Sequence, residues 1–201
     1  MNGDWLTELL RQCAHPGGAA ICGAMLWYPD ETIQHAGIVT GLGGYAGHSH
    51  KYKKKGGSGY LFRTSTVQDF SGVTGACLLV KTAVYDEMHG LDEQFAVAFN
   101  DVDFCLRVRD AGYRIAWTPY AELIHYESKS RGGDEKDPVK AARFAAEQQR
   151  LYTIHGKENI LDDPYYNPNL TRDREDFSES DDLRRLKEGR VTVRFRGGTL
   201  Q

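Results

Sequence analysis

Acidic residues at the start of a predicted helix are the first candidates for chemistry. In the run Asn-Asp-Val-Asp, Asp101 shares a helix face with the apolar Phe104, Cys105 and Val108, because residues three and four apart align. An acid at the open end of a buried face could act as a single general base on the floor of a cleft. The spacing also fits an acid that only complements the helix dipole, with Asn100 as the N-cap.

The other acid of this run, Asp103, falls on the opposite face of the helix. Arg107 follows it at the i,i+4 spacing of a helical ion pair, so we expect Asp103 to be a solvated surface acid. A metal hydrolase built on both acids and His125 is therefore disfavoured, since the two carboxylates point in opposite directions.

A histidine at the end of a predicted strand is the next candidate. His125 ends the strand 122–125 and precedes a polar segment that contains Ser130 and Arg131. Ligands of open α/β sheets gather at the carboxyl ends of strands, so this region could hold a metal and an anionic group. The alternative is a structural histidine before an ordinary polar loop.

The elements that must position these residues follow from hydrophobic spacing. It predicts helices over residues 4–13, 81–89, 100–111 and 138–154, and strands over 19–27, 32–39, 73–80, 113–118, 122–125 and 190–196. The segment 41–59 has almost no periodicity and predicts a long mobile loop, with the lysines of 51–55 at a solvated tip. Strands that alternate with helices indicate an α/β fold.

Composition limits the function classes. The 201 residues carry 25 Lys and Arg against 28 Asp and Glu, and this balance predicts no general affinity for nucleic acid. No apolar run is long enough for a membrane span, and the N-terminus does not resemble a signal peptide. The 4 cysteines lack zinc spacing, so we expect buried free thiols in a reducing compartment.

Several ordered motifs resemble the second half of a family 2 glycosyltransferase domain, and the resemblance covers residues 1 to about 177. They include the segments 28–37, 73–80, 90–93, 99–107, 111–119, 125–132 and 163–177. The last of these looks like the tail of bacterial members that build cell-surface polysaccharides.

The resemblance implies a GT-A fold and inverting transfer from a nucleotide-diphosphate sugar to a glycan or lipid-linked acceptor. It maps the catalytic base onto Asp101, with Asn100 in the position of the usual Glu, and it maps His125 onto a residue near the metal or diphosphate. Acceptor contacts would come from Thr74, Gly75, Ala76 and Asn100, and diphosphate contacts from Ser130 and Arg131. The implied cofactor is Mg²⁺ or Mn²⁺, and the implied location is the cytoplasm, peripheral at the inner face of the membrane.

One departure from the family is large. The family's Asp-x-Asp metal motif precedes a Trp-Leu helix like Trp5-Leu6, and here the only such triplet, Asp101-Val102-Asp103, belongs to the other motif. We therefore expect a partial GT-A fold without its nucleotide-binding half, with a catalytic, acceptor-side half over 1–155 and an extended tail over 156–201. Such a chain would be inactive alone and prone to self-association through exposed apolar surface. The alternative is a non-catalytic remnant that binds a sugar or a partner protein.

Overall fold

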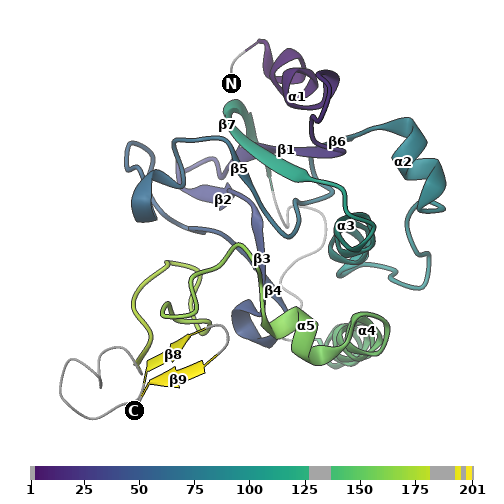
Figure 1. The fold of residues 1–201 in the computed structure, drawn as a ribbon, viewed down its shortest axis with the longest axis vertical. Helices are drawn as coiled ribbons and strands as arrows, with labels where there is room; N and C mark the ends of the chain where they lie inside the picture. The colour runs from purple at the N-terminus through teal and green to yellow at the C-terminus, as the bar shows by residue number, and fades with distance from the viewer. Residues whose placement is uncertain (1–2, 127–136, 182–192, 196–197, 201) are drawn as a thin grey trace.

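A mixed five-stranded sheet organises the chain. The structure is a computed structural model that describes residues 3–126, 137–181, 193–195 and 198–200. Strand β1 (Ile21–Trp27) runs parallel to β7 (Ile115–Ile124), and β5 (Gln68–Asp69) is antiparallel to β7. On its other side β1 pairs antiparallel with β2 (Ile33–His35) near its end and with β6 (Leu78–Val80) near its beginning. The observed class is thus α/β, as predicted (Figure 1).

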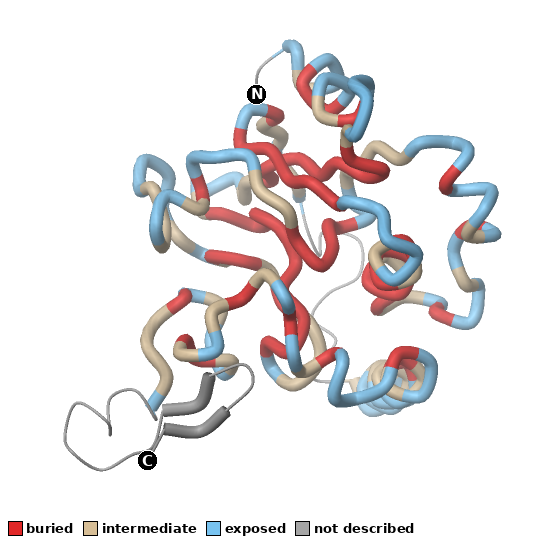
Figure 2. The backbone as a smooth tube through the Cα atoms, viewed as in Figure 1, coloured by how far each residue is buried: buried red, intermediate tan, exposed pale blue. Residues whose placement is uncertain are grey.

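Both faces of the sheet are covered by apolar side chains, and strand β1 shows why. Ile21 and Met25 point into one cluster with Phe104, while Cys22 and Leu26 point into a second cluster. This alternation is the period of two expected of a strand, and here each face meets a helix. The second cluster contains Leu9 and Cys13 of α1 (Trp5–Ala14). Figure 2 shows the buried backbone concentrated along these central strands.

Three other helices begin and end close to the predicted positions: α2 (Thr82–Glu87), α3 (Asn100–Asp110) and α4 (Pro138–His155). A further helix, α5 (Lys157–Leu161), is not predicted and lies where we expect the extended tail to begin. Gly112 has a φ of +87°, a conformation that favours glycine and ends α3 as predicted. No helix within the described ranges is long and apolar enough to cross a membrane.

Strand β7 differs from the prediction of two strands separated by Pro119. It continues through the proline, and its register against β1 shifts there, so that Thr118 pairs with Ala24 and Glu122 pairs with Met25. Residues 119–121 form the extra length of a bulge. A proline that cannot donate a ladder hydrogen bond is accommodated at a bulge.

The region 32–59 also differs from the prediction. The strand predicted over 32–39 is divided at Gly37, whose φ is +96°, into β2 and β3 (Ile38–Thr40). The mobile loop predicted over 41–59 is wrong, since it contains the 3₁₀ turn η1 (Leu42–Gly44) and strand β4 (Ala46–His48), which pairs with β3. A second 3₁₀ turn, η2 (Tyr60–Phe62), follows.

Three further predictions differ from the structure. Only the end of the predicted strand 73–80 is extended, as β6, because residues 73–77 turn against α3. The strand predicted at 190–196 is not alone: β8 (Val193–Phe195) pairs with β9 (Gly198–Leu200). On α4 the spacing of Ala142, Ala145 and Ala146 predicts a buried side, but these alanines are exposed, and the buried positions are Glu147, Leu151 and His155.

The core continues beyond residue 155, the predicted boundary between the catalytic half and the tail. Tyr166, Leu170 and Phe177 are buried in the same cluster as Ile21. The buried Asp163 accepts a hydrogen bond from the backbone N–H of Thr40 at 2.7 Å. These contacts hold residues 156–181 against the core, so this part of the predicted tail is packed and not extended.

Candidate functional site

The Asp101 carboxylate lies at the first turn of α3 and is half-buried. Its Oδ2 accepts a hydrogen bond from the Gly75 backbone N–H at 2.8 Å, and its Oδ1 accepts one from the Val102 N–H at 2.9 Å. A Cβ on Gly75 would lie 3.4 Å from Asp101 Cβ, so the two residues are in close contact. The structure thus joins two of the predicted site residues directly.

The helix face predicted below Asp101 is confirmed as buried, and it holds the segment 73–75. Cys105, one turn after Asp101, receives the Val73 N–H on Sγ at 3.5 Å and donates to the Val73 carbonyl at 3.6 Å. Burial raises the pKa of the Cys105 thiol to about 12, so this cysteine is a packing residue. The buried Thr74 accepts a hydrogen bond on Oγ1 from the Ala76 N–H at 3.3 Å, which closes the turn.

The capping role considered for Asn100 is wrong. Phe99, with a φ of +63°, is the residue that flanks α3, and Asn100 is already the first helical residue. The Asn100 Oδ1 atom instead accepts the Asp101 N–H at 2.7 Å. Asn100 therefore lies beside Asp101 at the helix start, and its predicted contact with an acceptor stays a prediction.

The solvated state predicted for Asp103 is wrong as well. Its side chain is 1% exposed because α4 covers that face of α3, and its Oδ1 lies 2.9 Å from His155 Nε2. The predicted pair with Arg107 is present, with Nη2 to Oδ2 at 2.8 Å. Burial raises the pKa of Asp103, but hydrogen bonds from His155 and Arg107 outweigh burial and leave that pKa below its usual value.

A pair of histidines that sequence reasoning missed lies behind the turn at 74–75. His35 on β2 is fully buried, and its Nε2 accepts the backbone N–H groups of Gly37 at 3.3 Å and Thr74 at 3.4 Å. Its Nδ1 lies 2.9 Å from Nδ1 of His48 on β4. Burial, followed by the nearby His48 and His125, holds the pKa of His35 well below its usual value. A signal was available in the sequence, where a histidine stands two residues before a turn glycine in an apolar strand.

His125 follows β7, at the same sheet edge as the end of β1. Its backbone N–H donates to the Trp27 carbonyl at 2.9 Å. Its Nδ1 is buried and has no hydrogen-bond partner among the described residues. His125 is among the groups that lower the pKa of His35, after burial and His48.

The described residues do not form a site for Mg²⁺ or Mn²⁺. Within the ranges that the structure describes, no group of three or more His, Cys, Asp or Glu side chains is arranged to hold a metal ion. His125 offers one ring nitrogen, whereas these hard cations prefer several oxygen ligands. Ser130 and Arg131, predicted to bind the diphosphate, lie outside the described residues.

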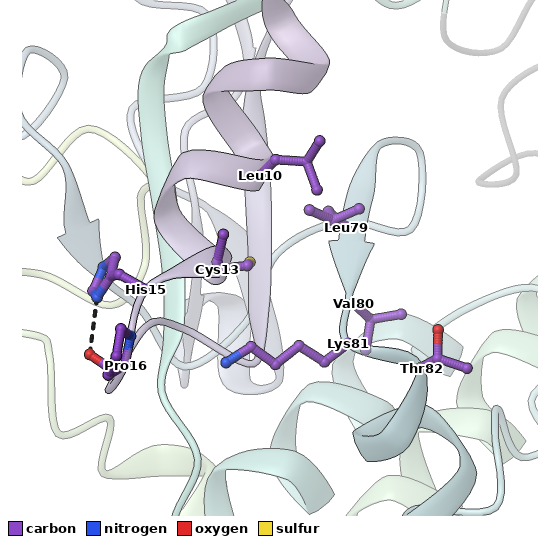
Figure 3. A pocket seen from close by; sticks show the side chains of 9 residues that line it. Leu10, Cys13, His15, Pro16, Leu79, Val80, Lys81 and Thr82 are labelled. Carbon is purple, nitrogen blue, oxygen red and sulfur yellow. Dashed lines mark hydrogen bonds between the residues drawn. The ribbon is translucent and has the colours of Figure 1, made fainter.

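A hollow of about 640 Å³ lies elsewhere, between the end of α1 and strand β6. Figure 3 shows Leu10 of α1 close to Leu79 of β6, with Lys81 at the lower rim. The Lys81 ammonium donates to the Gly18 carbonyl at 3.3 Å. Asp101 and His125 do not line this hollow, and its walls are mainly apolar, so it is a surface for packing more than a place for acid–base chemistry.

Comparison with known proteins gives three informative relatives. The chain is 47% identical over 175 residues, 87% of its length, to the uncharacterized protein y4gI of Sinorhizobium fredii. It is 35% identical over 169 residues, 84% of its length, to the O-antigen biosynthesis protein RfbC of Myxococcus xanthus. It is 32% identical over 80 residues, 40% of its length, to an N-acetylglucosaminyl-diphospho-decaprenol L-rhamnosyltransferase of Mycobacterium tuberculosis.

The chain spans only a small part of each relative. The matched regions are 19% of y4gI, 13% of RfbC and 24% of the rhamnosyltransferase. No family model matches the chain.

Proposed function

We propose that this chain is part of a family 2 glycosyltransferase that transfers a sugar from a nucleotide-diphosphate donor to a glycan or lipid-linked acceptor. The observation that carries the proposal is the similarity to RfbC over 84% of the chain. The similarity to a rhamnosyltransferase over 40% of the chain supports the transfer of a sugar. The names of these relatives favour a role in polysaccharide synthesis, and we propose that it takes place in the cytoplasm, at the inner face of the membrane.

The geometry of Asp101 supports a role as the general base. In the proposed reaction the acceptor hydroxyl loses its proton to the Asp101 carboxylate while its oxygen attacks the anomeric carbon. The bond from that carbon to the nucleoside diphosphate breaks on the opposite side, so the anomeric centre inverts. A carboxylate contributes mainly as the proton leaves in the transition state. The Gly75 N–H, 2.8 Å from Oδ2, would hold the carboxylate in place.

The remaining parts of the site stay proposals. Gly75 and Asn100 contact Asp101, and Thr74 and Ala76 flank Gly75 in the same turn; these four residues would contact the acceptor. Ser130 and Arg131 would bind the departing diphosphate, whose charge needs stabilisation. If Mg²⁺ or Mn²⁺ takes part beside His125, most of its oxygen ligands must come from outside the described residues.

We also propose that a donor-binding part outside these residues packs against β6 and α1. Among the strands that the structure describes, β6 pairs only with β1, so one of its edges is open. Next to it, Leu6 and Leu10 of α1 are 46% and 47% exposed. An open edge beside exposed apolar side chains is a surface suited to a further part of a longer protein.

Two assays test the proposal. Calorimetry of the 201-residue chain with UDP- and dTDP-sugars plus Mn²⁺ should show no micromolar binding. A chimera in which this chain replaces the 169 matched residues of RfbC should release nucleoside diphosphate from one donor of a UDP-, GDP- and dTDP-sugar panel, given a lipid extract as acceptor.

The parent RfbC serves as the positive control for the chimera. If the parent releases nucleoside diphosphate and the folded chimera releases none from any donor, the transferase proposal is wrong for this chain. Glycan binding by such an inactive chimera would instead indicate a sugar-binding remnant.

A further inference from the structure

We propose that His35 is a positioning residue for the Asp101 centre, and that it acts as a neutral ring with its proton on Nδ1. In this role it fixes the Thr74 amide, and through the adjoining Gly75 amide it orients the Asp101 carboxylate. The inference rests on the proposed function for its catalytic consequence, but its structural content can be tested separately.

The proton arrangement of His35 follows from its partners. Backbone N–H groups can only donate, and two of them, from Gly37 and Thr74, converge on Nε2. Nε2 must therefore keep its lone pair. The ring is fully buried, and its lowered pKa agrees with a neutral state, so its single proton is on Nδ1.

This arrangement fixes His48 in turn. Nδ1 of His35 lies 2.9 Å from Nδ1 of His48, and a hydrogen bond at that distance needs one donor and one acceptor. Because His35 donates, Nδ1 of His48 accepts, and a neutral His48 carries its proton on Nε2. The two rings meet nearly at right angles, with an interplanar angle of 85°.

The packing of Phe70 against Gly37 fixes the backbone next to His35. Gly37 turns back toward the ring with a φ of +96°, and a Cβ at this position would lie 2.6 Å from the Phe70 ring. A larger residue would clash with Phe70, and in the bent conformation that glycine allows the Gly37 amide donates to His35. On the far side of the turn, Thr74 and Gly75 are neighbours in the chain, and their amides bind His35 and Asp101 respectively. A shift of the Thr74 amide would therefore move the donor that holds Asp101.

Nuclear magnetic resonance of the imidazole nitrogens tests the proton arrangement in the 201-residue chain at pH 7.5. A long-range ¹H–¹⁵N correlation spectrum should show a protonated Nδ1 and an unprotonated Nε2 for His35, and the reverse for His48. The exposed His89 gives a reference for an imidazole in solvent. A His35 protonated on Nε2, or on both nitrogens, would overturn the inference.

Matched substitutions test the positioning role. Gln at position 35 can present an acceptor oxygen to the Thr74 amide, and Leu cannot, so amide hydrogen exchange at Thr74 and Gly75 should speed up in His35→Leu and much less in His35→Gln. Exposed His15→Leu is the control and should leave both amides unchanged. In the chimera, His35→Leu should lower kcat roughly 10–100-fold with KM for the donor unchanged, and His35→Gln should restore most of it.

The outcomes separate the two proposals. If the exchange rates of Thr74 and Gly75 respond equally to Gln and Leu, or to neither, His35 is not the residue that positions the turn, whatever the chimera does. If the chimera is inactive with native His35, the proposed function fails, while the spectra still decide the arrangement of the two rings.

Discussion

Asp101 combines a hydrogen bond to a separate segment with partial exposure to solvent. Its carboxylate completes a hydrogen bond to a separate segment at Gly75, yet the residue is only half-buried at the open end of α3. The contact with Gly75 shows that Asp101 does more than complement the helix dipole, because it also holds the turn at residues 74–75. Its exposure leaves room for an acceptor hydroxyl to approach.

Replacing Asp101 by Asn should lower the turnover of the chimera by about 10²–10⁴-fold, the usual contribution of a general base. The amide oxygen can still accept the Gly75 N–H, so the free energy of unfolding and donor binding should change little. Steady-state kinetics and urea denaturation check both statements. Asp110→Asn is the matched control, since Asp110 is the exposed last residue of the same helix. Equal losses in the two variants would reject the base assignment.

Asp103 gives the opposite expectation, because its carboxylate is buried between Arg107 and His155. Asp103→Asn leaves the Arg107 guanidinium without its counter-charge and weakens the contact with His155, so the free energy of unfolding at pH 7 should fall by roughly 3–5 kcal/mol. Urea denaturation measures this loss. A change below about 0.5 kcal/mol would show that the ion pair behaves like an exposed one.

The same carboxylate predicts an acid dependence. The folded pKa of Asp103 lies below its usual value of 3.8, so its contribution to stability is present above that pH and is lost as pH falls through the folded pKa. The stability difference between native protein and Asp103→Asn should therefore shrink below about pH 4. Urea midpoints measured from pH 7 to pH 3 test this, and a constant difference would contradict it.

At the scale of elements, α1 has one face in the core and another that is open. Leu9 is 1% exposed, whereas Leu6 and Leu10 are 46% and 47% exposed beside the open edge of β6. A helix with apolar residues on both faces is typical of an element covered on both sides. In the 201-residue chain the outer face should promote self-association.

The double variant Leu6→Ser and Leu10→Ser should reduce self-association and the binding of a hydrophobic dye, with little change in the unfolding temperature. Light scattering and dye fluorescence measure the two effects. Leu9→Ala is the control on the same helix, and because Leu9 is buried it should cost about 2–5 kcal/mol of stability. If native chain and double variant are both monomeric and bind no dye, the outer face is not a packing surface.

At the scale of the whole molecule, buried histidines tie stability to pH. His50 is 2% exposed, stacks on Phe177 with ring centroids 4.1 Å apart, and accepts the Tyr60 N–H on Nε2. Burial, then the nearby charges of Lys53 and Arg63, lowers the pKa of His50 to about 4. The ring is therefore neutral in the folded protein at pH values where the unfolded chain, with its usual value of 6.5, is protonated.

This difference sets the sign of the dependence. Between about pH 6.5 and pH 4 the unfolded chain binds a proton at residue 50 that the folded protein excludes, so stability is full above this window and falls within it. The expected slope from His50 is about 1.4 kcal/mol per pH unit, and His35 adds a slope of the same sign. Urea denaturation of native protein and His50→Gln at several pH values should give a shallower slope for the variant. Parallel profiles would contradict the assignment.

What the sequence determined by itself was local. The apolar run that forms β1, the glycine that ends α3 and the apolar face under Asp101 each follow from neighbouring residues, and all three are present in the structure. The motif resemblance assigns Asp101 and Gly75 to the same site, and the structure brings these two residues into contact.

What only the tertiary structure decided depends on segments far apart in the chain. Asp103 is buried because α4, some fifty residues later, covers its helix face, and i,i+4 spacing carries no information about that cover. His35 contacts both Thr74 and His48, and these three residues belong to separate segments of the chain. Strand β7 passes through Pro119 because its partner β1 tolerates a bulge there. A local pattern fixes which side chains share a face, but only the packed fold determines what that face meets.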